Sequence, residues 1–150
     1  EMELVFALKS GGTNIAEADA LSHIYGCAAG LDMTRRDLQN KAKENRKPWD
    51  TAKDVDESAV ITPLRQMSEV PSVASGRIHL SQNGTVKQDA DLSEMVWSVP
   101  EIIADLSTMY TLQQGDVIYM GTPAGVGAVS RGDVLAGGVE GIGDFEVKIA

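Results

Sequence analysis

The chain has 150 residues, a formal net charge of -9 and a sequence pI near 4.6. Because nucleic-acid affinity depends on Lys and Arg neutralising phosphates, this acidity argues against nucleic acid as a partner. No run approaches the ~20 apolar residues that span a bilayer, and the single Cys27 cannot form an internal disulfide. We therefore expect no membrane partner and a reducing, cytoplasmic compartment.

The first half of the chain begins with two expected strands. Residues 1–9 alternate between apolar and other side chains, which predicts a strand with Met2 and Leu4 on one face and Glu1 and Glu3 on the other. After a turn and a short Ala-rich helix, residues 24–31 form an apolar run with two glycines. Such a run predicts a strand that is buried on both faces or passes close to another backbone.

A helix and a long connection are expected next. Thr34 is followed three residues later by Asp37, which resembles a capping box and predicts a helix over residues 35–45. Glu44 interrupts the basic residues of this stretch, so a solvated helix face is the expected arrangement. Residues 47–64 contain two prolines and no sustained period, which predicts an irregular connection laid over the core.

The second half is rich in strand and turn signals. Asn83-Gly84 lies between two strand-like runs and predicts a hairpin with a type I′ turn. Ser98-Val-Pro-Glu101 is a capping-box pattern that predicts a helix over residues 99–109. A short strand at 116–120, a Gly-rich loop at 121–127 and weak alternation from 134 onward complete the chain. The expected class is α+β, mainly β, in one domain covering residues 1–150.

Three carboxylates are candidates for chemistry. Glu1 and Glu3 are two residues apart on a strand, so their side chains project from the same face. They either bind a divalent cation together or lie hydrated on an exposed face. Asp32 follows an apolar strand and is either a helix cap or a ligand. Together the three would form an all-oxygen site suited to Mg²⁺ or Mn²⁺.

Other catalytic patterns find little support in the sequence. The chain has two histidines and no G-x-S-x-G, which argues against a serine or cysteine triad. The loop 121–127 matches neither common nucleotide-binding glycine motif, because no Lys follows and no helix clearly begins. It is either a tight turn or an anion-binding loop built from backbone N–H groups and the Thr122 hydroxyl.

The order and spacing of several motifs resemble the fumarylacetoacetate hydrolase superfamily over almost the entire chain. The motifs are Glu1-Met-Glu3, the segment 30–39 (GLDMTRRDLQ), the segment 48–53 (PWDTAK), Ser98-Val-Pro-Glu101 and the loop 121–127 (GTPAGVG). The resemblance implies a mixed β-sandwich roll of the type found in the C-terminal domain of that family, usually as a homodimer.

The same resemblance implies roles for individual residues. It assigns the catalytic metal, Mg²⁺ in the first place and otherwise Mn²⁺ or Ca²⁺, to Glu1, Glu3 and Asp32. It assigns the keto-acid end of the substrate to Arg36, Gln39, Lys53, Gly121 and Thr122. Lys53 also has an expected catalytic role, because its charge would stabilise the departing enolate.

Within the superfamily, the sequence resembles the fumarylpyruvate hydrolases of gentisate breakdown, a route of aromatic catabolism. The residues that carry this resemblance are the segments 34–39, 48–50 and 91–93 together with Trp97. This implies metal-dependent hydrolysis of a carbon–carbon bond in a 2,4-dioxo acid (an acylpyruvate), namely fumarylpyruvate, to fumarate and pyruvate. A hydroxymuconate-type isomerase and an oxaloacetate decarboxylase remain alternatives, because both share these ligands. A non-enzymatic β-rich binding domain is the alternative from another class.

One part of the family pattern has no counterpart here. In related enzymes the His and Glu that activate water come from a segment that precedes the E-x-E motif, and this sequence starts at that motif. We therefore expect the natural protein to carry an additional N-terminal segment.

Overall fold

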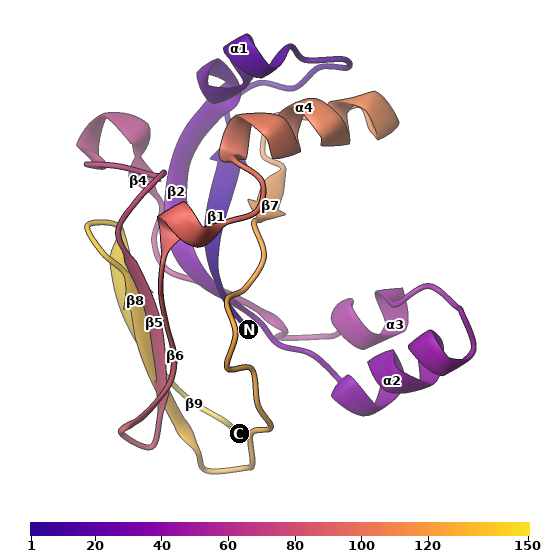
Figure 1. The fold of residues 1–150 in the computed structure, drawn as a ribbon, viewed down its shortest axis with the longest axis vertical. Coiled ribbons are helices and arrows are strands. Elements are labelled where there is room, and N and C mark those ends of the chain that lie inside the picture. The colour runs from indigo at the N-terminus through magenta and orange to yellow at the C-terminus, as the bar shows by residue number, and fades with distance from the viewer.

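Two antiparallel β-sheets pack over a shared core in the computed structural model, which describes residues 1–150 (Figure 1). The first sheet has the strand order β3-β2-β1-β7, with β4 also pairing β2, and the second has the order β6-β5-β8-β9. The strands are β1 (Met2–Leu8), β2 (Ile24–Asp32), β3 (Ala59–Ile61), β4 (Arg65–Gln66), β5 (Arg77–Gln82), β6 (Thr85–Asp91), β7 (Val117–Tyr119), β8 (Val134–Val139) and β9 (Gly143–Lys148). The expected α+β class with mainly β structure is confirmed.

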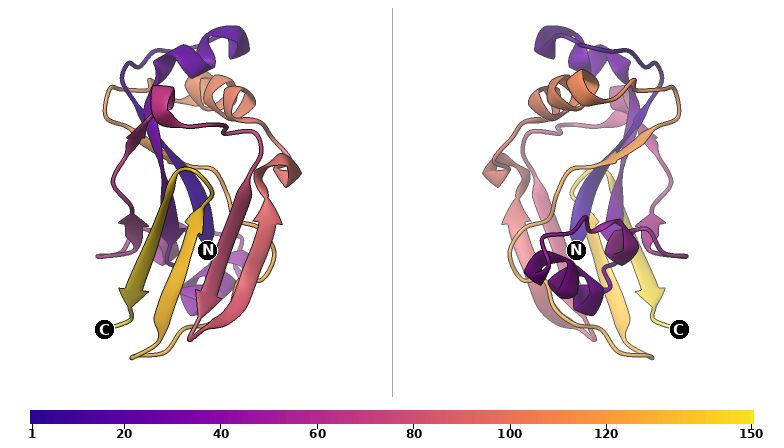
Figure 2. Two further views of the ribbon diagram at one scale, coloured as in Figure 1. Left: turned by 90° about the vertical axis from the view of Figure 1, so that its left-hand side faces the viewer. Right: turned by 90° about the vertical axis from the view of Figure 1, so that its right-hand side faces the viewer.

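The helices gather in two places. They are α1 (Glu17–Ala20), α2 (Arg36–Glu44), α3 (Asp50–Lys53) and α4 (Val99–Met109), with single 3-10 turns η1 (Leu21–His23), η2 (Met67–Glu69) and η3 (Leu92–Glu94). Figure 1 shows α1 and α4 together at one end of the molecule, whereas α2 and α3 form an arm beside the sheets. Figure 2 shows the same arrangement from two sides, with the four-stranded sheet at the end opposite to α1 and α4. None of the helices is both long and apolar enough to cross a lipid bilayer.

Strand β1 is more deeply buried than its sequence pattern indicates. All seven of its residues are buried, so the expected alternation of buried and exposed positions is wrong on the second face. The reason is that β1 is central, between β2 and β7, and that its second face is also covered. A Cβ atom added to Gly30 would lie 2.7 Å from a methyl group of Val5 and 2.9 Å from the ring of Tyr119. The missing side chain at Gly30 therefore leaves room for both.

Strand β2 was expected to be buried on both faces or to pass close to another backbone, and both expectations are confirmed. Seven of its nine residues are buried, and a Cβ atom on Gly26 would lie 2.2 Å from the carbonyl oxygen of Arg65 on β4.

Both the expected hairpin at Asn83-Gly84 and the expected helix over residues 99–109 are also confirmed. Asn83 and Gly84 adopt the positive φ values of 52° and 77° that a type I′ turn requires. Ser98 and Glu101 form the reciprocal capping box of α4.

The helix expected over residues 35–45 is confirmed as α2, but its expected cap and the expected irregularity of residues 47–64 are wrong in part. Helix α2 begins at Arg36 and has no side-chain cap, because the Thr34 hydroxyl accepts a hydrogen bond from Lys53 instead of from the helix. The segment 47–64 is not irregular throughout, since it contains α3 and β3. Buried Ala52 and the pairing of β3 with β2 hold these short elements in place, and neither interaction produces a periodic sequence pattern.

Candidate metal and keto-acid site

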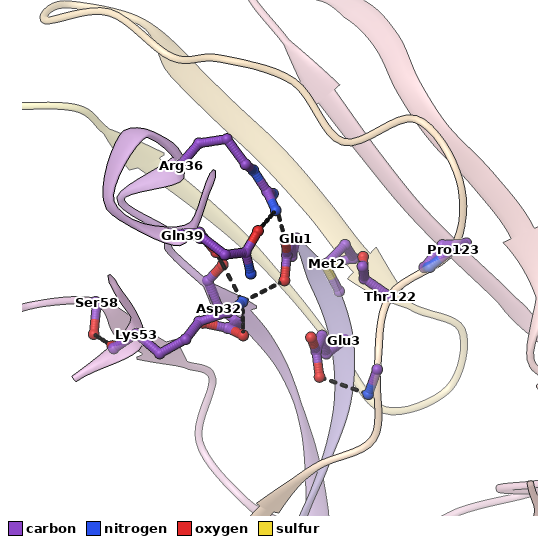
Figure 3. A network of polar contacts seen from close by, with 12 residues as sticks. Glu1, Met2, Glu3, Asp32, Arg36, Gln39, Lys53, Ser58, Thr122 and Pro123 are labelled. Atoms are coloured by element: carbon purple, nitrogen blue, oxygen red, sulfur yellow. Dashed lines mark hydrogen bonds and ion pairs between the residues drawn. The ribbon is translucent and has the colours of Figure 1, made fainter. Parts of the chain in front are cut away.

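The register between β1 and β2 brings the three predicted carboxylates together. Glu3 pairs with Gly30 and Met2 with Leu31, and the Asp32 N–H donates to the Glu1 carbonyl oxygen over 2.9 Å. Directly opposed residues in an antiparallel pair point to the same face, so Asp32 joins Glu1 and Glu3 on one side of the sheet. Carboxylate oxygens of the three residues lie within 4.8 Å of one another (Figure 3).

Glu3 is the most deeply buried member of this cluster. It is 4% exposed, and its single hydrogen-bond donor is the backbone N–H of Gly121, 2.7 Å from its carboxylate oxygen. Burial, opposed in part by this hydrogen bond, raises the pKa of Glu3 to about 7, and the charges of Asp32 and Glu1 act in the same direction as burial. The Glu3 carboxylate therefore lacks the compensation that a buried charge needs.

Two cationic side chains from the α2–α3 arm face the cluster. The Lys53 ammonium donates to the carboxylates of Glu1 and Asp32 over 2.6 and 2.5 Å and to the Thr34 hydroxyl over 2.8 Å. The Arg36 guanidinium donates to the other Glu1 oxygen over 2.5 Å. Burial would raise the pKa of Glu1, but the hydrogen bonds from Lys53 and Arg36 outweigh it and hold that pKa below its usual value.

The ammonium of Lys53 is stabilised by the same contacts. Burial alone would lower its pKa, yet hydrogen bonds to Asp32 and Glu1 raise the pKa of Lys53 above its usual value. All three of its donors are used. The lysine is therefore charged at neutral pH and aimed at the place where the three carboxylates converge.

Gln39 supports this arrangement from inside α2. It is 2% exposed, and its side-chain oxygen accepts a hydrogen bond from Arg36 over 2.6 Å. One guanidinium thus bridges Gln39 and Glu1 (Figure 3). Gly121 and Thr122 reach the cluster from the loop after β7, where Gly121 adopts a φ of +96° and its N–H binds Glu3. All eight residues singled out from the sequence lie in or beside one site.

Two cavities border this cluster. A cavity of about 440 Å³ is lined by Glu1, Thr34 and Arg36 together with the loop 125–129. A larger one of about 580 Å³ is lined by Gly121 and Thr122 and by apolar side chains such as Trp97, and it contains none of the three carboxylates. The smaller cavity carries Glu1 and Arg36 and the larger one carries Thr122, so a keto acid bound at the cluster can contact groups from both walls.

Sequence reasoning missed three contributors. Thr34 is an acceptor for Lys53, Ser58 donates to the Lys53 carbonyl oxygen over 3.0 Å, and Gln88 on β6 reaches the loop at Thr122. The T-x-x-D pattern that suggested a cap was the signal for Thr34, and nothing in the sequence marked the other two. The histidines lie elsewhere, since His23 contacts Ser10 and His79 belongs to β5.

The donor set fits a divalent cation. Carboxylate oxygens are the ligands that Mg²⁺, Mn²⁺ and Ca²⁺ prefer, and a buried carboxylate with one hydrogen bond has lone pairs to offer. Glu3 has this property, and Glu1 and Asp32 lie within ligand reach of it. The alternative in which Glu1 and Glu3 are hydrated separately on an exposed face is inconsistent with the burial of Glu3.

Comparisons with known proteins agree with this geometry. The chain is 50% identical over 149 residues to the fumarylpyruvate hydrolase of Ralstonia sp, covering 99% of this chain and 77% of that protein. It is 36% identical to the mitochondrial oxaloacetate tautomerase FAHD1 of Rattus norvegicus, covering 99% of this chain and 67% of that protein. The crystal structure of fumarylpyruvate hydrolase from Pseudomonas aeruginosa in complex with Mn²⁺ and pyruvate superposes with a TM-score of 0.97 at 41% identity.

This chain spans 64% of that solved structure and is itself covered completely. The model of the fumarylacetoacetate (FAA) hydrolase C-terminal family matches residues 1–150. With the two sheets, the ordered motifs and the carboxylate cluster in agreement, the chain belongs to the fumarylacetoacetate hydrolase C-terminal family.

Proposed function

We propose that this protein hydrolyses a carbon–carbon bond in a 2,4-dioxo acid with the help of a divalent metal ion, and that its substrate is fumarylpyruvate. The observation that carries the proposal is the convergence of Glu1, Glu3 and Asp32 with Lys53 and Arg36. It combines a cation site with two fixed positive charges, which suits an anionic keto acid. The 50% identity to a fumarylpyruvate hydrolase supports the choice of substrate.

The three carboxylates would hold the metal ion. When bound, a divalent cation supplies Lewis-acid polarisation of the keto-acid oxygens and stabilises negative charge that develops on them. The relative from Pseudomonas aeruginosa was solved with Mn²⁺ and pyruvate, which supports a divalent ion without selecting one. We propose Mg²⁺ as the ion bound in the cell, and titration with both metals tests that choice.

The residues of the arm would bind and orient the substrate. Arg36, fixed by Gln39, offers N–H donors to the substrate carboxylate, as charge-assisted hydrogen bonds that are stronger than neutral ones. Lys53 would offer its ammonium to the 2-oxo group by exchanging a hydrogen bond that it makes to Glu1 or Asp32 in the free protein. Thr122 offers its hydroxyl from the opposite loop.

The reaction that follows is a hydrolysis with a carbanion leaving group. The oxygen of water forms a bond to C4, the C3–C4 bond breaks, and its electron pair passes to C3 to give the pyruvate enolate. A proton then returns to C3, and the products are fumarate and pyruvate. Lys53 would lie where this negative charge develops, and one preorganised charge of this kind contributes about 10²-fold or more to the rate.

A product assay tests the proposal. The full-length protein with Mg²⁺ or Mn²⁺ is offered a panel of 2,4-dioxo acids, and the products are identified by NMR. Fumarate plus pyruvate from fumarylpyruvate is the expected result. A rearranged acid would identify an isomerase, and CO₂ with pyruvate from oxaloacetate would identify a decarboxylase. No turnover of any panel member would refute the proposal.

We also propose a homodimer in the cytoplasm. Large apolar side chains are exposed near α4, with Val96 94%, Tyr110 63% and Met109 62% exposed, and these suit burial against a second subunit. Sedimentation velocity of the full-length protein at several concentrations measures the oligomeric state.

A further inference from the structure

The site contains a buried amide that the sequence motifs do not include. Gln88 on β6 is 1% exposed, so each of its polar atoms needs a partner inside the protein. Its side-chain oxygen accepts a hydrogen bond from the Met2 N–H over 3.0 Å. Its side-chain nitrogen donates to the Pro123 carbonyl oxygen and to the Thr122 hydroxyl oxygen, each over 2.8 Å. The amide therefore links the E-x-E strand to the loop after β7.

The orientation of this amide follows from its partners. A backbone N–H can only donate, so the atom facing Met2 must be the amide oxygen. A backbone carbonyl can only accept, so the atom facing Pro123 must be the amide nitrogen. Both assignments agree, and an inverted amide would lose both bonds. The second hydrogen of the nitrogen then has one partner, the oxygen of Thr122.

This assignment determines the role of the Thr122 hydroxyl. Its oxygen already accepts a hydrogen bond from Gln88, and its own proton bonds to no protein acceptor. A hydroxyl can accept and donate at once, and accepting here leaves the proton free to point elsewhere. Thr122 is partly exposed and lines the larger cavity, so a ligand can reach this proton.

The neighbouring loop residues confirm that β6 supports this loop. Gly125 has a φ of +102°, and a Cβ atom placed there would lie 1.9 Å from the Lys87 carbonyl oxygen and 3.3 Å from the Gln88 side chain. The loop thus lies directly on β6 at two points. Gly121, one residue before Thr122, binds Glu3. A shift of Gln88 would therefore move both the loop and the end of β1.

We propose that Gln88 is a positioning residue that fixes the Thr122 hydroxyl as a hydrogen-bond donor to the carboxylate of the keto acid. The inference rests on the proposed function for the nature of the ligand, but its geometric part does not. Gln88 is 1% exposed and uses its amide on Met2, Thr122 and Pro123, so we assign it no direct bond to the substrate or the metal. It acts by occupying the acceptor site of Thr122 and by holding the loop at a constant distance from Met2.

The test uses the full-length, Mn²⁺-loaded protein, with pyruvate as the probe and calorimetry as the measurement. Thr122→Val removes the donor and should weaken pyruvate binding about tenfold or more, the usual effect of losing a hydrogen bond to a charged group. Gln88→Glu introduces a carboxylate that accepts from the Thr122 hydroxyl and turns its proton away from the ligand. It should weaken pyruvate binding to a similar extent and leave Mn²⁺ affinity within about threefold.

The double variant decides between positioning and mere stability. If Gln88 orients the hydroxyl, then Thr122→Val in the Gln88→Glu background should cause less than about a twofold further loss, because the donor is already turned away. If the two losses multiply, the proposal is overturned.

Gln82→Glu is the matched control. Gln82 lies on the adjacent strand and donates to Asp133 and to the Ala128 carbonyl oxygen farther along the same loop, but it does not bond to Thr122. The effect of Thr122→Val should be unchanged in that background. A control that also abolished the effect of Thr122→Val would overturn the proposal, since any disturbance of the loop would then suffice.

A measurement on the unmodified protein keeps the geometry testable if a variant fails to fold. The two side-chain amide protons of Gln88 should exchange with water slowly and give separate NMR signals, because both are bonded inside the protein. Rapid exchange of both would refute the geometry. If no dioxo acid is turned over while the binding cycle shows the expected coupling, the proposed function fails and this inference stands.

Discussion

The replacement of Lys53 by Met is the sharpest test of the site, because this change keeps much of the side-chain length and removes the charge. In the native protein, the ammonium contacts Glu1, Asp32 and Thr34 at 2.5–2.8 Å. The same charge would lie beside the carbon on which the enolate forms. Removing one preorganised charge of this kind typically lowers kcat by about 10²–10³-fold, or about 2.7–4 kcal/mol. We expect a loss in that range for Lys53→Met.

Metal binding should respond in a different way. Lys53 is not a ligand, and its positive charge opposes the entry of a second cation between Glu1 and Asp32. Its loss should leave the dissociation constant for Mn²⁺ unchanged or lower it. Without metal, Glu1 retains Arg36 but Asp32 loses its ion pair, so the metal-free variant should unfold at a lower temperature than the native protein.

The assays are steady-state kinetics with fumarylpyruvate, calorimetric titration with Mn²⁺ and thermal unfolding with and without metal. Lys41→Met is the matched control, because Lys41 is exposed on α2 and has no ion pair in this structure. It should change none of the three measurements appreciably. A Lys53→Met enzyme with near-normal kcat, or with Mn²⁺ affinity reduced more than about tenfold, would refute the assigned role.

Three further predictions concern the carboxylates and the loop. Asp32→Ala should abolish metal-dependent turnover and leave the circular dichroism spectrum intact, because the strand pairing of β2 does not use that side chain. A loss of fold with metal binding retained would contradict this. With a Glu3 pKa of about 7, the apparent Mn²⁺ affinity should fall as pH is lowered below 7 and level off above it. The metal-free protein should instead lose stability as pH rises from about 4.5 to 7, because the folded state then keeps a proton that the unfolded state has lost. An Mn²⁺ affinity that does not change from pH 5 to 8 would show that Glu3 is no ligand. Gly125→Ala should destabilise the fold by more than about 1 kcal/mol in denaturant titrations, because the added carbon would overlap the Lys87 carbonyl oxygen.

Much of this site could be predicted because its motifs lie on regular elements. The alternation of residues 1–9 placed Glu1 and Glu3 on one face, and the apolar run ending at residue 31 placed Asp32 at the end of a strand. The pairing of those strands could not be read from the sequence. It depends on the register across a connection of 15 residues between Leu8 and Ile24, which no turn motif specifies.

Two of the missed contributions, those of Gln88 and Thr34, share one physical cause. Gln88 is a polar residue on the buried face of a strand, where it only interrupts the alternation of apolar residues that predicts a strand. The role of the Gln88 side chain depends on its hydrogen bonds to Met2 and Thr122, which are 86 and 34 residues away in the sequence. Thr34 was misread for a similar reason, since its true partner, Lys53, is 19 residues distant. Local patterns report local bonds, and these bonds are not local.

The separation between strand β1 and the α2–α3 arm has a consequence for motion. Every residue of β1 is buried at the centre of its sheet, whereas most of the residues in α2 and α3 are exposed on an arm beside the sheets (Figure 1). Local opening favours segments with few buried contacts, so the arm should fray long before the strand does. Lys53 and Arg36 can then withdraw from the carboxylates and return while Glu3 stays in place. Ligand exchange and metal retention would in this way be governed by two separate cooperative units of one small protein.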